Sequence, residues 1–129
     1  MTGAQIVGML EIGLSSYPEP NGAFMQVSAI HVEFDSSRKA RERVVKVTID
    51  ADPELSFDAF KERAFVVAMP SVMGYLEKLG TDEFLEGCER LVDEEYAVFV
   101  QEPVWDFVAT AGVLQYPPNA ARNRIKDVA

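Results

Sequence analysis

The sequence predicts an α+β domain in which an antiparallel β-meander is followed by helices packed on its apolar face. Three observations support this prediction. Apolar residues alternate in the first part of the chain and recur every three or four positions after Ser56, and a turn rich in proline and glycine separates the early segments. With 129 residues, 48% of them hydrophobic, the chain can bury one core. We expect a single domain over residues 1–116 and a basic C-terminal tail over 117–129.

The first predicted element, residues 5–14, fits two structures. Its alternate positions are apolar, which favours a strand. Thr2 and Gln5 resemble a capping box, which favours a helix. Three glycines argue against the helix, because each would cost about 1 kcal/mol inside it. These glycines are Gly3, Gly8 and Gly13. The predicted element is therefore a strand.

Two further strands are predicted with more support. Residues 15–22 contain two prolines and an Asn-Gly pair, and they predict a turn. Residues 24–34 and 42–50 then alternate between apolar and polar side chains, and a polar, basic link over 35–41 joins them. Runs of similar length joined this way predict an antiparallel meander with one solvated face. It has three strands, or four if a later segment joins it.

The period changes at Ser56, which is predicted to cap a helix with an apolar stripe as far as Met69. The second half of this helix is expected to be buried nearly all round. Pro70 should end it, because proline has no N–H to donate. Ser71 then starts a helix that Gly80 ends.

The remaining segments predict two or three more helices. Thr81 opens a helix that carries an apolar stripe as far as Val92. Residues 96–101 either extend this helix, which we favour, or supply the fourth strand. A short helix follows the break at Pro103, and residues 119–128 carry apolar side chains at the spacing of a tail helix.

Charge is distributed unevenly along the chain. Residues 50–106 carry fifteen acidic and four basic side chains, whereas the rest carries six acidic and eight basic ones. The isoelectric point is near 4.5. An acidic surface of this kind disfavours direct binding to nucleic acid or to anionic membranes. The N-terminus has no secretory signal, and no apolar run is long enough to span a membrane.

These observations lead to the prediction of a small, non-catalytic binding module or inhibitor that uses no cofactor. Such acidic proteins without motifs are typical of phage and mobile elements, which is an argument by analogy. The partner would be a basic protein or a second copy of the chain. Acidic side chains on one helical face would bind it, with an aromatic anchor. The predicted partner-binding residues are Glu83, Glu86, Glu89, Asp93, Glu94 and Trp105.

A secondary basic patch is predicted at the tip of the hairpin, at Arg38, Lys39, Arg41 and Arg43. It is either a solvated tip that protects the strand edges or a contact with the acidic helices of a second copy. An alternative function is that of a structural subunit or assembly chaperone. In that case the chain would associate with itself through the tail at 117–129.

Three sets of polar residues receive a structural interpretation. His31 is predicted to be a cross-strand histidine rather than a general base. Cys88 is predicted to be an inert core thiol, and a single cysteine fits a reducing cytoplasm. A cation site remains open at Asp50, Asp52 and Glu54, but we favour a solvated loop there.

Overall fold

The computed structural model describes residues 1–70, 80–92, 94–112 and 124–129. These residues fall into two units, one formed by residues 1–88 with 123–129 and the other by residues 89–122. The first unit holds α1 (Gly3–Leu14), β1 (Ile30–Phe34), β2 (Val44–Ile49), α2 (Phe57–Glu62), the 3₁₀ helix η2 (Asp82–Phe84) and β3 (Ile125–Asp127). The second holds the 3₁₀ helix η3 (Glu94–Tyr96) and α4 (Gln101–Ala111).

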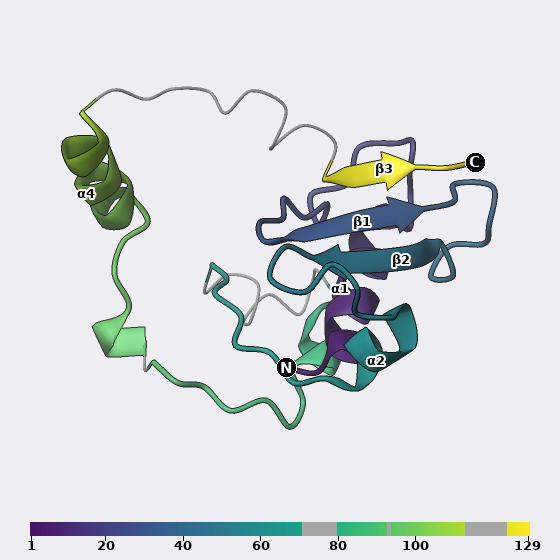
Figure 1. Ribbon diagram of the computed structural model, residues 1–129, viewed down its shortest axis with the longest axis horizontal. Coiled ribbons are helices and arrows are strands. Elements are labelled where there is room, and N and C mark those ends of the chain that lie inside the picture. The colour runs from purple at the N-terminus through teal and green to yellow at the C-terminus, as the bar shows by residue number, and fades with distance from the viewer. Residues whose placement is uncertain (71–79, 93, 113–123) are drawn as a thin grey trace. The chain divides into compact units, whose positions relative to one another are not determined.

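The fold is α+β with a three-stranded mixed sheet in the order β2-β1-β3 (Figure 1). β1 and β2 form the predicted antiparallel hairpin, in which Val32 faces Val47. The expected purely antiparallel meander is wrong, because β3 pairs with the other edge of β1 in the parallel direction. The predicted tail helix over 119–128 is also wrong within the described residues. Residues 125–127 form β3 instead, and Ile125 packs against the core.

The strand predicted over residues 5–14 is instead a helix, α1. Its N-terminus has the capping box formed by Thr2 and Gln5. A Cβ at Gly3 would lie 1.9 Å from the carbonyl oxygen of Phe60, and one at Gly8 would lie 2.2 Å from the Phe84 ring. The glycines therefore cost helix propensity but allow α1 to approach its neighbours closely. This tertiary requirement outweighs their intrinsic preference.

α2 begins where the sequence predicts it, with the Ser56 hydroxyl accepting a hydrogen bond from the Ala59 N–H. It ends at Glu62, well short of Met69. Beyond it, the chain is extended and pairs with the N-terminus, where the Phe65 N–H donates to the Met1 carbonyl. The expected burial on all sides is wrong, since Val66 is 84% exposed.

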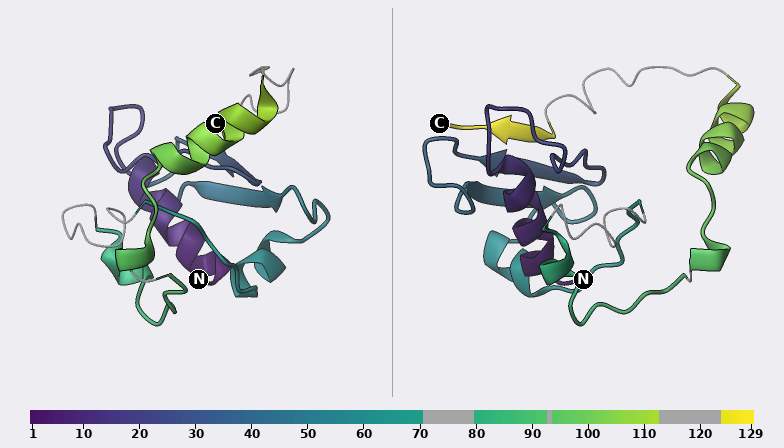
Figure 2. Two further views of the ribbon diagram at one scale, coloured as in Figure 1. Left: turned by 90° about the vertical axis from the view of Figure 1, so that its left-hand side faces the viewer. Right: turned by 180° about the vertical axis from the view of Figure 1, so that it is seen from behind.

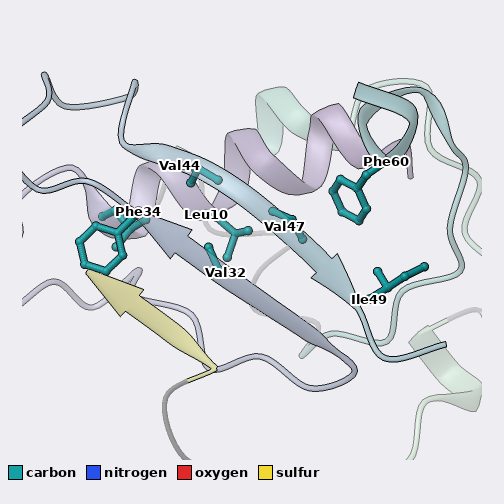
Figure 3. Packing of buried hydrophobic residues seen from close by; sticks show 8 residues of the cluster. Leu10, Val32, Phe34, Val44, Val47, Ile49 and Phe60 are labelled. Atoms are coloured by element: carbon teal, nitrogen blue, oxygen red, sulfur yellow. The ribbon is translucent and has the colours of Figure 1, made fainter. Parts of the chain in front are cut away.

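The core lies between one face of the sheet and the two helices α1 and α2 (Figure 3). The view from behind in Figure 2 shows α1 crossing in front of the strands. Apolar side chains from every second position of β1 meet those of β2 and the helices. The buried cluster consists of Leu10, Leu14, Val32, Phe34, Val44, Val47, Ile49 and Phe60.

The later helices differ from the prediction in length. The helix expected from Thr81 to Val92 is reduced to the single turn η2, and Gly87 follows it with a φ of 75°. α4 begins at Gln101, so that Pro103 lies in its first turn, where its missing N–H costs nothing. The helix predicted from Ser71 to Gly80 lies outside the described residues.

Candidate functional site

A cavity of about 710 Å³ opens beside α1 in the first unit. This volume is in the range of pockets that bind small molecules. Most of its lining is apolar and comes from separate stretches of the chain: Met1, α1, residues 22–30, residues 49–51, α2 and residues 65–70. Representative lining residues are Ile6, Met9, Phe24, Met25, Phe60 and Phe65.

The loop that carries Phe24 is fixed to the C-terminal end of α1. The Asn21 side chain donates from Nδ2 to the Ile12 carbonyl over 3.2 Å and accepts from the Ala23 N–H over 2.9 Å. A Cβ at Gly13 would lie 2.7 Å from the Ala23 carbonyl oxygen. The glycine therefore allows the loop to lie directly on the helix, which positions Phe24 at the cavity.

The opposite rim of the cavity is formed by residues 28–30 and 49–51. The Asp50 N–H donates to the Ala29 carbonyl over 2.9 Å and ties these two stretches together. Ala29 has a φ of 62°, in the left-handed region that residues with a Cβ seldom adopt. This rim therefore holds a strained backbone conformation.

A polar cluster of His31, Asp50 and Arg124 lies next to this rim. One Asp50 oxygen is 2.9 Å from His31 Nε2, and the other accepts a hydrogen bond from Arg124 Nη1 over 3.1 Å. The Arg124 hydrogen bond is the main cause that lowers the pKa of the Asp50 carboxyl below its usual value, against the opposing effect of desolvation. The cluster therefore keeps Asp50 ionised and fixed in place.

The predicted acidic face does not exist as one helical surface. Glu83 lies in η2, Glu86 follows it in a turn, and Glu89 belongs to the other unit in an irregular segment. Without a continuous helix, a spacing of three or four residues no longer places side chains on one face. Asp93 lies outside the described residues, Glu94 lies in η3, and Trp105 is exposed on α4.

The predicted basic patch is largely engaged within the chain. Arg38 pairs with Asp35 at 3.3 Å, and Arg41 pairs with Glu83 at 3.0 Å. Arg43 donates to the backbone carbonyls of Leu14, Tyr17 and Arg38, and Lys39 is exposed. The structure thus gives three of the four residues of this patch intramolecular partners. Contact of the hairpin tip with a second copy stays a prediction.

The open cation site receives no support from the geometry. Asp50 belongs to the polar cluster, and Asp52 pairs with Arg63 at 3.2 Å. Among the described residues, no group of three or more His, Cys, Asp or Glu side chains could hold a metal ion. Cys88 is half-buried, with its sulfur 3.6 Å from the Gln5 side-chain oxygen, and it is not part of a helical stripe.

Sequence reasoning missed Glu11, a buried carboxylate on α1. It accepts hydrogen bonds from the backbone N–H groups of Arg43 and Val44, at the point where the register of β1 and β2 shifts. Glu11 therefore ties the helix to the start of β2. The available signal was an acidic residue between Leu10 and Ile12 in an otherwise apolar stretch.

Residues 1–75 match the family model described as 5'-nucleotidase, C-terminal domain. The match covers more than half of the chain, and the chain therefore belongs to this family. Among solved structures, the chain is similar to the 5'-nucleotidase precursor from Thermus thermophilus, with 25% identity and a TM-score of 0.79. That likeness covers 98% of this chain but only 24% of the other. No curated protein matches the chain.

These findings correct the predicted function. The chain is a domain of a hydrolase family. The prediction of a non-catalytic binder or inhibitor of phage or mobile-element origin is therefore wrong, and so is the alternative of a structural subunit or chaperone. The prediction that the protein is not an enzyme is corrected for the same reason, because the family to which the chain belongs is one of hydrolases. The acidic composition and the lack of a short motif favoured the wrong class of protein, because neither property identifies a function. No helix among the described residues is long and apolar enough to cross a membrane, and a cytoplasmic location stays a prediction.

Proposed function

We propose that this chain acts as the C-terminal domain of an enzyme that hydrolyses 5'-nucleotides, and that its cavity holds the nucleoside part of the substrate. One observation carries the proposal. The lining residues that the structure describes all lie between Met1 and Pro70, inside the region that matches the family. The apolar cavity and the family relationship therefore belong to the same part of the chain.

The chemistry of the lining suits a nucleoside. A nucleobase has two apolar faces, and stacking on an aromatic ring contributes about 1–3 kcal/mol per base. Phe24 and Phe65, both half-buried, bring partly accessible rings to the lining. Among the described lining residues, Asp50 alone has an ionisable side chain, and it is acidic. A phosphate would find no cationic side chain among these residues, so we place the phosphate outside the cavity.

The proposed role is to bind and position the nucleotide rather than to cleave it. The chain spans only 24% of the length of the Thermus thermophilus relative. In a larger hydrolase, a domain that holds the nucleoside would orient the phosphate towards the reacting groups. Such positioning lowers the barrier by removing translational and rotational freedom before the reaction.

The proposal is tested by titrating the chain with ligands and recording NMR spectra at each step. We expect adenosine to shift the amide signals of the residues that line the cavity, and ribose 5-phosphate, which lacks the base, to leave them unchanged. Ala51→Trp or Ala68→Trp adds an indole at the cavity and should weaken adenosine binding about tenfold or more. Ala40→Trp, on the exposed hairpin tip, is the matched control. Adenosine shifts that are absent, or that lie away from the cavity, would contradict the proposal.

A further inference from the structure

Three segments that are far apart in sequence meet at the His31, Asp50 and Arg124 cluster. His31 comes from β1, Asp50 follows β2, and Arg124 directly precedes β3. Besides its bond to Asp50, Arg124 Nη1 lies 3.4 Å from both His31 Nε2 and the Ile30 carbonyl oxygen. The Arg124 side chain is only 21% exposed, so it is mostly enclosed.

β3 is attached to the sheet along its length and at both ends. It is three residues long and lies at the edge. At its start, the Val32 N–H donates to the Arg124 carbonyl over 2.6 Å, and at its end the Val128 N–H donates to the Phe34 carbonyl over 2.8 Å. Short edge strands with few hydrogen bonds open more readily than core elements. To this pairing the Arg124 side chain adds contacts at the start of β3, and the Asp127 carboxylate adds one at its end, where it accepts from the Ser36 N–H over 3.0 Å.

The same Arg124 side chain reaches the rim of the cavity through Asp50. Asp50 lines the cavity together with Ala29 and Ala51, and its own N–H holds the Ala29 carbonyl. Ala29 is in the left-handed conformation, which persists only where surrounding contacts maintain it. An interaction that holds the Asp50 carboxylate in place therefore also holds the backbone of residues 28–30 and 49–51.

We propose that Arg124 is a positioning residue for the cavity, and that β3 must be seated for the rim at residues 28–30 and 49–51 to keep its shape. The C-terminal strand thereby controls ligand affinity without touching the ligand. The geometry of the cluster carries this inference. It rests on the proposed function only for the identity of the ligand, the nucleoside.

The charges around Asp50 determine how the cluster responds to pH. His31 and Arg124 face its carboxylate directly, and Asp52 with Arg63 forms the next ion pair along the chain. Farther along the sheet, Glu33 is paired in register with Lys46 on β2 and with Lys126 on β3. The pKa of the Asp50 carboxyl is lowered by its partners. The stability that the ionised carboxylate gives the folded chain is therefore fully present above the ordinary pKa of 3.8, and it is lost as the pH falls through the lowered pKa.

The experiment uses the whole chain with three variants. Arg124→Gln removes the charge, Arg124→Lys keeps it, and Lys126→Gln removes a charge from the same strand, away from the cluster. We expect Arg124→Gln to speed hydrogen exchange at the Asp50 amide about tenfold and to weaken adenosine binding by a similar factor. The pKa of the Asp50 carboxyl, followed by NMR, should rise towards 3.8. Arg124→Lys should restore part of each property, and Lys126→Gln should change none of them.

The outcomes separate this inference from the proposed function. Unchanged exchange at Asp50 and an unchanged pKa of its carboxyl in Arg124→Gln would overturn the positioning role, whatever the ligand. Equal acceleration across the whole first unit, in Arg124→Gln and Lys126→Gln alike, would also overturn it, because it would show a general loss of stability. If adenosine fails to bind the unmodified chain, the proposed function fails, and exchange and titration still decide the role of Arg124.

Discussion

The two units of this chain have similar patterns of apolar residues but differ in how far those residues are buried. In the first unit, apolar side chains are buried on both helices and both long strands, and Val32 and Phe60 are only 1% exposed. In the second unit, α4 has no buried residue, and Val104, Trp105 and Phe107 are 55%, 71% and 64% exposed. Both α1 and α4 carry apolar residues at helical spacing.

The difference shows what periodicity does and does not determine. A stripe of apolar residues specifies which side of a helix is apolar, but burial also requires a partner that fits against it. α1 has glycines where Phe60 and Phe84 approach it closely. The match to the 5'-nucleotidase C-terminal domain family, over residues 1–75, includes this packed region and excludes α4.

The largest expected effect contrasts a phenylalanine from each unit. Phe60→Ala should lower the free energy of unfolding by about 3–5 kcal/mol, because it leaves a cavity under the sheet. Phe107→Ala should change it by less than about 0.5 kcal/mol, since the ring is mostly exposed. Urea denaturation of both variants measures the contrast. A large loss in Phe107→Ala would show that the apolar side of α4 is covered in solution.

A second prediction concerns the polar contact that joins α1 to β2. Glu11→Ala should cost about 2–3 kcal/mol of unfolding free energy, because the N–H groups of Arg43 and Val44 lose a charged acceptor inside the protein. Glu11→Gln should cost less, since its amide oxygen still accepts. Glu19→Ala, at an exposed position, is the control for thermal denaturation. Equal stability of the Glu11 and Glu19 variants would contradict this role.

The smallest expected effect tests the strained rim of the cavity. Ala29→Gly should raise the free energy of unfolding by about 0.5 kcal/mol, because glycine adopts a positive φ without the steric cost that a Cβ brings. Ala40→Gly, in the exposed link between β1 and β2, should lower it slightly, since only the unfolded chain gains freedom there. Calorimetry measures the midpoint of thermal unfolding of both variants. A lower midpoint for Ala29→Gly than for the unmodified chain would contradict the strain assigned to Ala29.

The sequence predicted the parts of the fold that depend on local signals. Alternation over 24–34 and 42–50 located the hairpin, and Ser56 located the start of α2. It did not predict β3, because three residues at the edge of a sheet carry no periodic pattern. The sequence also failed to predict α1. Gly3 is needed there because the Phe60 backbone lies so close that a Cβ would not fit, and this closeness depends on tertiary packing.

The candidate site was harder to predict than the fold. The cavity draws its lining from several separate stretches of chain, and none of them forms a motif. The cluster that holds the rim joins Asp50 to Arg124 across 74 positions. His31 and Asp50 were each predicted to have a structural role, without reference to one another. A single sequence carries no signal for contacts between residues so far apart in the chain.

The parallel pairing of β1 with β3 has a consequence for how this domain can vary. Bringing Arg124 to Ile30 closes a loop of 94 positions, and the entropy of closing a loop grows only with the logarithm of its length. Doubling such a loop would cost about 0.6 kcal/mol. A longer insertion between β2 and β3 therefore costs little stability as long as both strands keep their pairing and packed residues such as Phe60 stay in place.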